Sequence, residues 1–223
     1  EAMPALLSVL AHVAQWERNL VLRNAATQLD ETAIEWVCTE PGREGAEPYT
    51  QSGPEVVLES LRQGAGAAAV WADVPAKLRV RNRSGHKLHF LLLHFSVDYG
   101  IHKLYNEPVP SGDDWVTLYG DNPNQNFWVG ENEAEAIDRL KLLVSTERVD
   151  DFLLTQEDLK RVEVRSTMRG MGERRGMGQK MRDEDWLVKD KTVRTVRRLD
   201  ELGSRDWVSP NGRITVKGHL SLT

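Results

Sequence analysis

The chain has 223 residues, of which 40% are hydrophobic and 28% are charged, enough for one hydrophobic core and too long for a disulfide-stapled miniprotein. Its 29 basic and 34 acidic residues give a net charge of −5, which argues against a general nucleic-acid or anionic-membrane surface. A single cysteine, Cys38, excludes an intrachain disulfide, and no apolar run approaches the roughly 20 residues that span a bilayer. We expect a soluble, cytoplasmic piece of a longer chain, because Glu1 to Pro4 lack both an initiator methionine and signal-peptide character.

Residues 1–24 predict an N-terminal amphipathic helix that packs on a sheet. Apolar residues recur there at the spacing of one helical face, among them Leu6, Leu10 and Val13, with polar residues between them. The period is lost after Asn24, where we expect the helix to end.

Most of the remaining chain predicts β-strands with period-two alternation. Residues 34–39 alternate clearly, and 77–81 and 88–97 flank a turn at 82–85, which predicts a central hairpin. Residues 56–58 fit a short strand or a helical turn. Further strands are expected at 101–105, 115–119, 140–145, 186–188, 192–196 and 213–220. Their spacing predicts a mainly β (α+β) fold, an antiparallel β-sandwich formed by residues 32–159 and 184–223.

Between the predicted strands at 140–145 and 186–188, the composition changes from strand-forming residues to glycine and basic residues. Thr155 begins a capping pattern that permits a short helix near 156–163. Residues 160–183 then form a Gly-, Met- and Arg-rich segment, and 160–182 hold eight basic against two acidic residues. We expect a flexible basic loop there, in contrast to the acidic stretch 30–59.

The sequence around Cys38 and the spacing of the clustered histidines argue against catalysis and against metal binding. Cys38 shares one strand face with Ile34 and Trp36, which indicates a buried structural thiol rather than a nucleophile. His86, His89, His94 and His102 fall within 17 residues, but a metal would need His102 folded back beside His94. We therefore expect no catalytic residue, no metal site and no cofactor.

The basic loop is the candidate binding or processing segment. It lacks the GxGxxG spacing of a dinucleotide site and has no aromatic residue for base stacking, which argues against nucleic acid. Docking on an acidic partner or proteolytic processing fits its exposed charges better. The basic residues concerned are Arg165, Arg169, Arg174, Arg175, Lys180 and Arg182.

The seven tryptophans are many for this length. Trp16 lies off the main apolar stripe of the first helix and is expected against the sheet through a second helix face or at an interface. Trp115, Trp128 and Trp186 are expected to pack on the sheet. A carbohydrate-binding platform of exposed coplanar tryptophans is the alternative.

Several segments together resemble the non-catalytic region that follows the protease domain in bacterial caspase-like (peptidase C14 type) proteins. The segments are 10–18, 78–85, 98–105, 140–147 and 185–189, which read LAHVAQWER, LRVRNRSG, DYGIHKLY, LKLLVSTE and DWLVK. Each is short and unspecific, but together they span most of the chain.

The resemblance implies an accessory, regulatory protein-binding module rather than a peptidase. The family's catalytic histidine is followed by Gly, which no histidine here is, and Val37-Cys38-Thr39 does not match its nucleophile. Expected partners are a caspase-like protease domain, in the same or a companion chain, or its protein substrate. The family tends to cleave after basic residues, which makes the loop a candidate processing site. The alternatives are a processed fragment or subunit of an active caspase-like cysteine peptidase, or a carbohydrate-binding sandwich.

Overall fold

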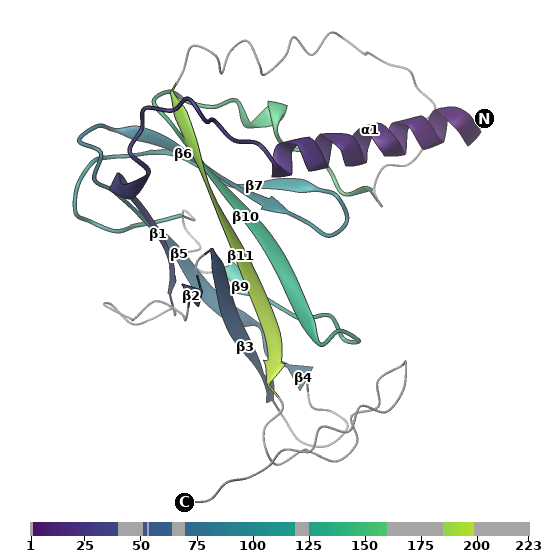
Figure 1. The fold of residues 1–223 in the computed structure, drawn as a ribbon. Helices are drawn as coiled ribbons and strands as arrows, with labels where there is room; N and C mark the ends of the chain where they lie inside the picture. Colours follow the sequence, from purple (N-terminus) through teal and green to yellow (C-terminus); the bar gives the residue numbers. More distant parts are fainter. Residues whose placement is uncertain are drawn as a thin grey trace, which may run out of the picture.

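The computed structural model describes residues 2–39, 51–52, 54–63, 70–118, 125–159 and 185–198. This part of the chain is mainly β with one α-helix, as the sequence predicts (Figure 1). Two sheets form the fold, and helix α1 (Ala2–Leu20) lies at one end of the larger sheet with its N-terminal half extending beyond the strands (Figure 1).

The smaller sheet has four strands in the order β1-β5-β8, with β9 also paired to β5. Every pairing in it is antiparallel. Glu31–Ala33 form a short 3₁₀ turn, η1, that leads into β1 and is capped by the side chain of Asp30. The strands are β1 (Ile34–Thr39), β5 (Val74–Asn82), β8 (Val116–Thr117) and β9 (Gln125–Phe127).

The larger sheet has seven strands in the order β2-β3-β11-β10-β6-β7, with β4 paired to β3. It is mixed, because β11 runs parallel to β3 while the other pairs are antiparallel. The long strands β10 and β11 run side by side through it (Figure 1). Its strands are β2 (Gln51–Ser52), β3 (Glu55–Gln63), β4 (Val70–Trp71), β6 (Leu88–Phe95), β7 (Ile101–Val109), β10 (Glu135–Ser145) and β11 (Trp186–Arg198).

Both faces of the larger sheet are covered, which explains the nearly continuous apolar run of β6. Phe90 and Leu92 belong to a core shared with the smaller sheet. Leu91 and Leu93 point the other way, into a second core that contains Trp16 of α1. A strand buried on both faces cannot alternate between apolar and polar residues. The two cores therefore hold the smaller sheet and α1 on opposite sides of the larger sheet.

The predicted central hairpin is wrong. Strands β5 and β6 belong to different sheets, and β6 pairs with β7 and β10 instead. The chain crosses between the sheets after Asn82, whose side-chain amide donates hydrogen bonds to the carbonyls of His86 and Val109. These bonds fix a connection between layers at a place where the turn residues alone suggest a hairpin.

Other boundaries also differ from the sequence prediction. Helix α1 ends at Leu20, four residues before Asn24, and residues 56–58 lie within the nine-residue strand β3. Within the short helix predicted near 156–163, residues 156–158 are not helical and Gln156 makes an isolated bridge with Ile101, whereas Leu159 has 3₁₀ conformation. Asp150 instead caps a 3₁₀ turn, η3 (Asp151–Leu153). Residues 160–163 and the predicted strand 213–220 lie outside the described residues.

Candidate functional site

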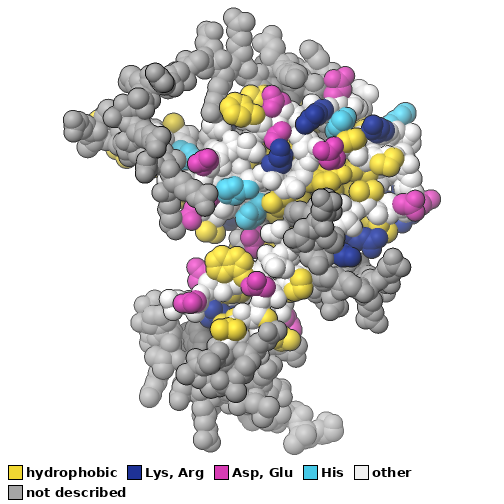
Figure 2. Space-filling view, turned by 180° about the vertical axis from the view of Figure 1, so that it is seen from behind, with side chains coloured by type: hydrophobic (Ala, Val, Ile, Leu, Met, Phe, Trp, Pro, Cys, Tyr) yellow, Lys and Arg dark blue, Asp and Glu magenta, His cyan; other side chains and the backbone are white. Residues whose placement is uncertain are grey.

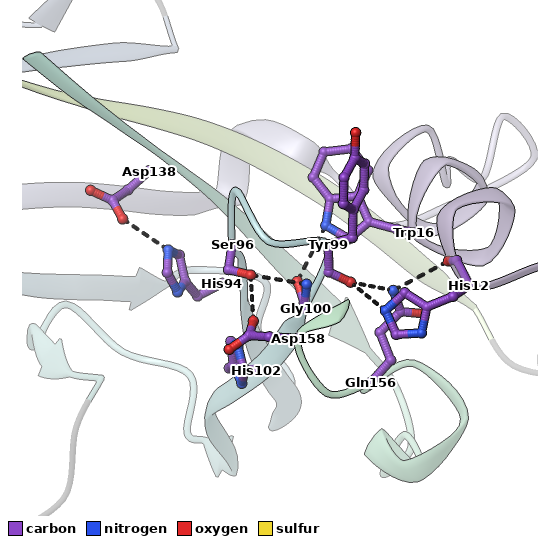
Figure 3. Close-up of polar contacts among 10 residues, drawn as sticks. All are labelled: His12, Trp16, His94, Ser96, Tyr99, Gly100, His102, Asp138, Gln156 and Asp158. Atoms are coloured by element: carbon purple, nitrogen blue, oxygen red, sulfur yellow. Dashed lines mark hydrogen bonds and ion pairs between the residues drawn. The ribbon is translucent and has the colours of Figure 1, made fainter. Parts of the chain in front are cut away.

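A cluster of polar side chains from distant parts of the chain surrounds the turn that joins β6 to β7. The Ser96 hydroxyl donates to Asp158 Oδ1 at 2.6 Å and accepts the backbone N–H of Gly100 at 2.9 Å (Figure 3). His102 Nε2 lies 2.9 Å from the same Asp158 oxygen. We call these four residues, Ser96, Gly100, His102 and Asp158, the Gly100 cluster.

The same turn anchors the N-terminal helix. Tyr99 has a positive φ of 62°, which presents its carbonyl to two donors, His12 Nε2 at 3.0 Å and Gln156 Nε2 at 2.5 Å (Figure 3). The indole N–H of Trp16 donates to the carbonyl of Gly100 at 3.2 Å. The turn therefore connects α1, the β6–β7 hairpin and the segment that contains Gln156.

Trp16 lies where the sequence predicts, against the sheet. Its ring packs edge-on against Phe95 and Tyr99, with centroid distances of 5.7 and 5.4 Å. Trp186 is also buried. The prediction that Trp128 packs on the sheet is wrong, because 64% of this residue is exposed. It directly follows β9 and is no longer held by strand pairing. Trp115 is half-buried just before β8.

Two of the four clustered histidines come together across β6 and β7. His94 is paired with His102 in the strand register, and their ring centroids are 6.2 Å apart. Each Nε2 already faces a carboxylate, that of Asp138 at 2.8 Å for His94 and that of Asp158 for His102 (Figure 3). No group of three or more His, Cys, Asp or Glu residues in the described ranges could hold a metal ion.

The Gly100 cluster contains the residue types of a hydrolase triad without its connections. A nucleophilic serine needs a histidine that accepts its proton while a carboxylate orients the other ring nitrogen. Here Ser96 and His102 both bond to one oxygen of Asp158, so the carboxylate separates them instead of supporting a relay. The arrangement suits a structural junction that fixes the turn, not acyl transfer.

Cys38 is fully buried on β1, on the face that it shares with Ile34 and Trp36, as its strand pattern predicts. Burial raises the pKa of its thiol to about 12, although the nearby Lys191 favours the thiolate. A thiol that holds its proton at neutral pH and contacts no solvent is a poor nucleophile.

We expect Cys38 to react with a disulfide reagent such as DTNB only after unfolding. In native protein the expected labelling is below about 5% of the rate in 6 M guanidinium, because the reacting species is the thiolate. The rate of labelling is measured from the absorbance of the thiolate that DTNB releases. Rapid native labelling that stops in Cys38→Ala would show that the thiol is accessible.

The predicted binding or processing residues Arg165, Arg169, Arg174, Arg175, Lys180 and Arg182 lie outside the described residues. Acidic and basic side chains are interspersed on the described surface seen in Figure 2, without one sign dominating that face. Among the described residues, no helix is long and apolar enough to cross a membrane.

One surface that sequence reasoning missed lies on α1. Its inner side packs on the sheet through Trp16, while large apolar side chains on its outer side remain exposed. They are Met3, Leu6, Leu7 and Leu10, each 54–67% exposed, and we call them the α1 stripe. The apolar pattern predicts that Leu6 and Leu10 belong to the helix face that packs on the sheet, and this is wrong. Both are exposed, and Trp16, which lies off that stripe, makes the contact instead.

Comparison with protein-family models and with curated proteins gives no match for this chain.

Proposed function

We propose that this chain is a non-catalytic accessory module that binds a caspase-like protease domain, in the same or a companion chain, for regulation or substrate recognition. The exposed α1 stripe is the observation that carries the proposal. Four large apolar side chains on one projecting helix end are costly to leave in water, and such patches commonly mark protein interfaces.

The proposed mode is insertion of a helix into a groove. Met3, Leu7 and Leu10 are spaced by four and three residues, so they lie along one line of the helix surface. A partner that covers this line needs an apolar groove about two helical turns long. The resemblance to caspase-associated regions makes a protease domain the partner to test first. In the alternative, a fragment or subunit of an active caspase-like cysteine peptidase, the burial of Cys38 disfavours this thiol as the nucleophile.

The test is calorimetric titration of the chain with a purified bacterial caspase-like protease domain. Leu7→Glu/Leu10→Glu is expected to weaken binding at least about tenfold, because burying one charge in an apolar groove costs more than 1.4 kcal/mol. Both positions are solvent-exposed, so the fold should persist in circular dichroism.

The matched control is Leu61→Glu/Val70→Glu, which adds the same charge at exposed apolar positions on β3 and β4. Its binding should equal that of the unmodified chain. The proposal fails if the unmodified chain does not bind, or if both double variants lose affinity equally.

A further inference from the structure

The outward face of the smaller sheet carries a row of basic side chains. Lys77, Arg79 and Arg81 alternate along β5 with the buried residues Leu78 and Val80. Alternation places all three on the side of the sheet away from the core. We call Lys77, Arg79 and Arg81, together with the neighbouring Trp115, the β5 basic row.

The arginines of this row are held in position by an aromatic ring. The guanidinium of Arg81 lies 4.6 Å from the centre of the Trp115 ring, and that of Arg79 lies 5.6 Å from it. Stacking on an indole orients the guanidinium plane and reduces the entropy lost when its N–H groups bind an acceptor. Trp115 is occupied by this stacking, so it offers no platform for a nucleic-acid base.

The charges of the row are only partly neutralised. Arg81 donates hydrogen bonds to Glu35, its neighbour in the strand register, from Nε at 3.1 Å and from Nη2 at 2.5 Å. Lys77 and Arg79 face Thr39 and Val37 on β1, and Arg79 faces Thr117 on β8. Neither basic side chain has an ion-pair partner among the described residues. Two half-buried cations thus have donors available on a chain whose net charge is −5.

We propose that the β5 basic row binds an extended acidic peptide segment of a partner protein, with carboxylates on Lys77 and Arg79. Residues two apart on a strand face are separated by about 6.7 Å, which matches acidic side chains at alternate positions of an extended peptide. Arg79 supplies the planar fork that a carboxylate accepts, and Lys77 supplies a second charge. This inference concerns a surface other than the α1 stripe and does not rest on the proposed protease partner.

The test uses the full chain and an alternating Glu-Ser octapeptide in isothermal titration calorimetry at low salt. Saturable binding is expected, and Arg79→Gln should weaken it about fivefold, as should Lys77→Gln, because each removes one ionic contact. Arg79→Lys should give an intermediate affinity, because charge remains but the fork is lost. The corresponding Gln-Ser octapeptide should not bind.

The matched control is Lys87→Gln, which removes an exposed basic charge between β5 and β6, outside the row. It changes net charge by the same amount and should leave the affinity unchanged. The proposal is overturned if the Glu-Ser peptide does not bind, or if Lys87→Gln weakens binding as much as Arg79→Gln. It is also overturned if inorganic phosphate at equal concentration displaces the peptide, since the site would then be a general anion site. Leu7→Glu/Leu10→Glu should bind the peptide normally, which separates this result from the fate of the proposed function.

Discussion

Replacing Asp190 by alanine is expected to lower the free energy of unfolding by about 3 kcal/mol at pH 6. Asp190 is the counterion of Lys141, which is only 1% exposed and whose ammonium donates to Asp190 Oδ1 at 2.8 Å. Arg23 pairs with the same carboxylate from the segment after α1. Removing Asp190 leaves a buried ammonium without its partner. Chemical denaturation with a two-state fit measures the effect.

The size of this effect is limited by the lysine itself. Burial, reinforced by the positive charge of Arg23, lowers the pKa of Lys141 from 10.5 to about 7, even though its ammonium contacts the Asp190 carboxylate. In Asp190→Ala the lysine can release its proton, which at pH 6 costs about 1.4 kcal/mol per pKa unit. The remaining loss comes from the hydrogen bond and from the Arg23 pair, so we expect the lower end of the range for broken buried pairs.

Two variants separate the buried charge from other causes. Adding Lys141→Met to Asp190→Ala should restore most of the lost stability, because the double variant buries no charge at this position. Glu147→Ala, which removes an exposed carboxylate, should change stability by less than about 0.5 kcal/mol. If Lys141→Met gives no rescue, the buried ammonium is not the source of the loss.

The lowered pKa of Lys141 also fixes the sign of a pH effect. Below pH 7 the lysine is protonated in the folded and unfolded chains, so the cost of burying its charge is fully present. Between about pH 7 and 10.5 the unfolded chain keeps a proton that the folded chain has released, and stability rises with pH. Lys141→Met lacks this rise. The unmodified chain should therefore gain stability relative to Lys141→Met from pH 7 to pH 10 in matched denaturation curves.

Local patterns in the sequence were sufficient to predict the N-terminal helix and most of the longer strands, but not the short strands or the pairing partners. The alternation of residues 34–39 predicts β1 with its bounds, and the mainly β class follows from such segments. Pairing depends on contacts distant in sequence. Strand β11 pairs in parallel with β3, more than 120 residues earlier, and nothing local to 186–198 indicates it. Similarly, Asn82 connects two sheets through a carbonyl 27 residues away, which a turn pattern cannot distinguish from a hairpin.

The candidate surfaces were harder to predict than the fold for the same reason. The condition stated for the histidines, His102 beside His94, is met, but the carboxylates that occupy both rings lie 44 and 56 residues away in sequence. The basic alternation of β5 was visible in the sequence. Its stacking partner Trp115 and its incomplete neutralisation depend on strands that join β5 only in the folded chain.

Replacing Gly100 by alanine is expected to lower the free energy of unfolding by about 2–3 kcal/mol, the cost of losing hydrogen bonds to a charged group. A Cβ at this position would lie 2.1 Å from Asp158 Oδ1, 2.6 Å from His102 Nε2 and 2.9 Å from Ser96 Oγ. These atoms end side chains and can move, but moving them breaks the bonds of Ser96 and His102 to Asp158. The expected loss of stability therefore comes from breaking the hydrogen bonds of the Gly100 cluster and not from a clash with rigid backbone.

The matched control is Gly112→Ala, where the nearest atom to an added Cβ is the backbone nitrogen of Asp114 at 4.0 Å. Its stability should change by less than about 0.5 kcal/mol.

In an Asp158→Ala background, Gly100→Ala should lower the free energy of unfolding clearly less than in the unmodified chain. The atom closest to the added Cβ and the hydrogen bonds to Asp158 are already absent there. Native-state hydrogen exchange should also show faster opening of α1 in Gly100→Ala, since the Gly100 carbonyl accepts the indole N–H of Trp16. Equal costs for Gly100→Ala and Gly112→Ala would mean that the Gly100 cluster contributes little to holding the helix on the sheet.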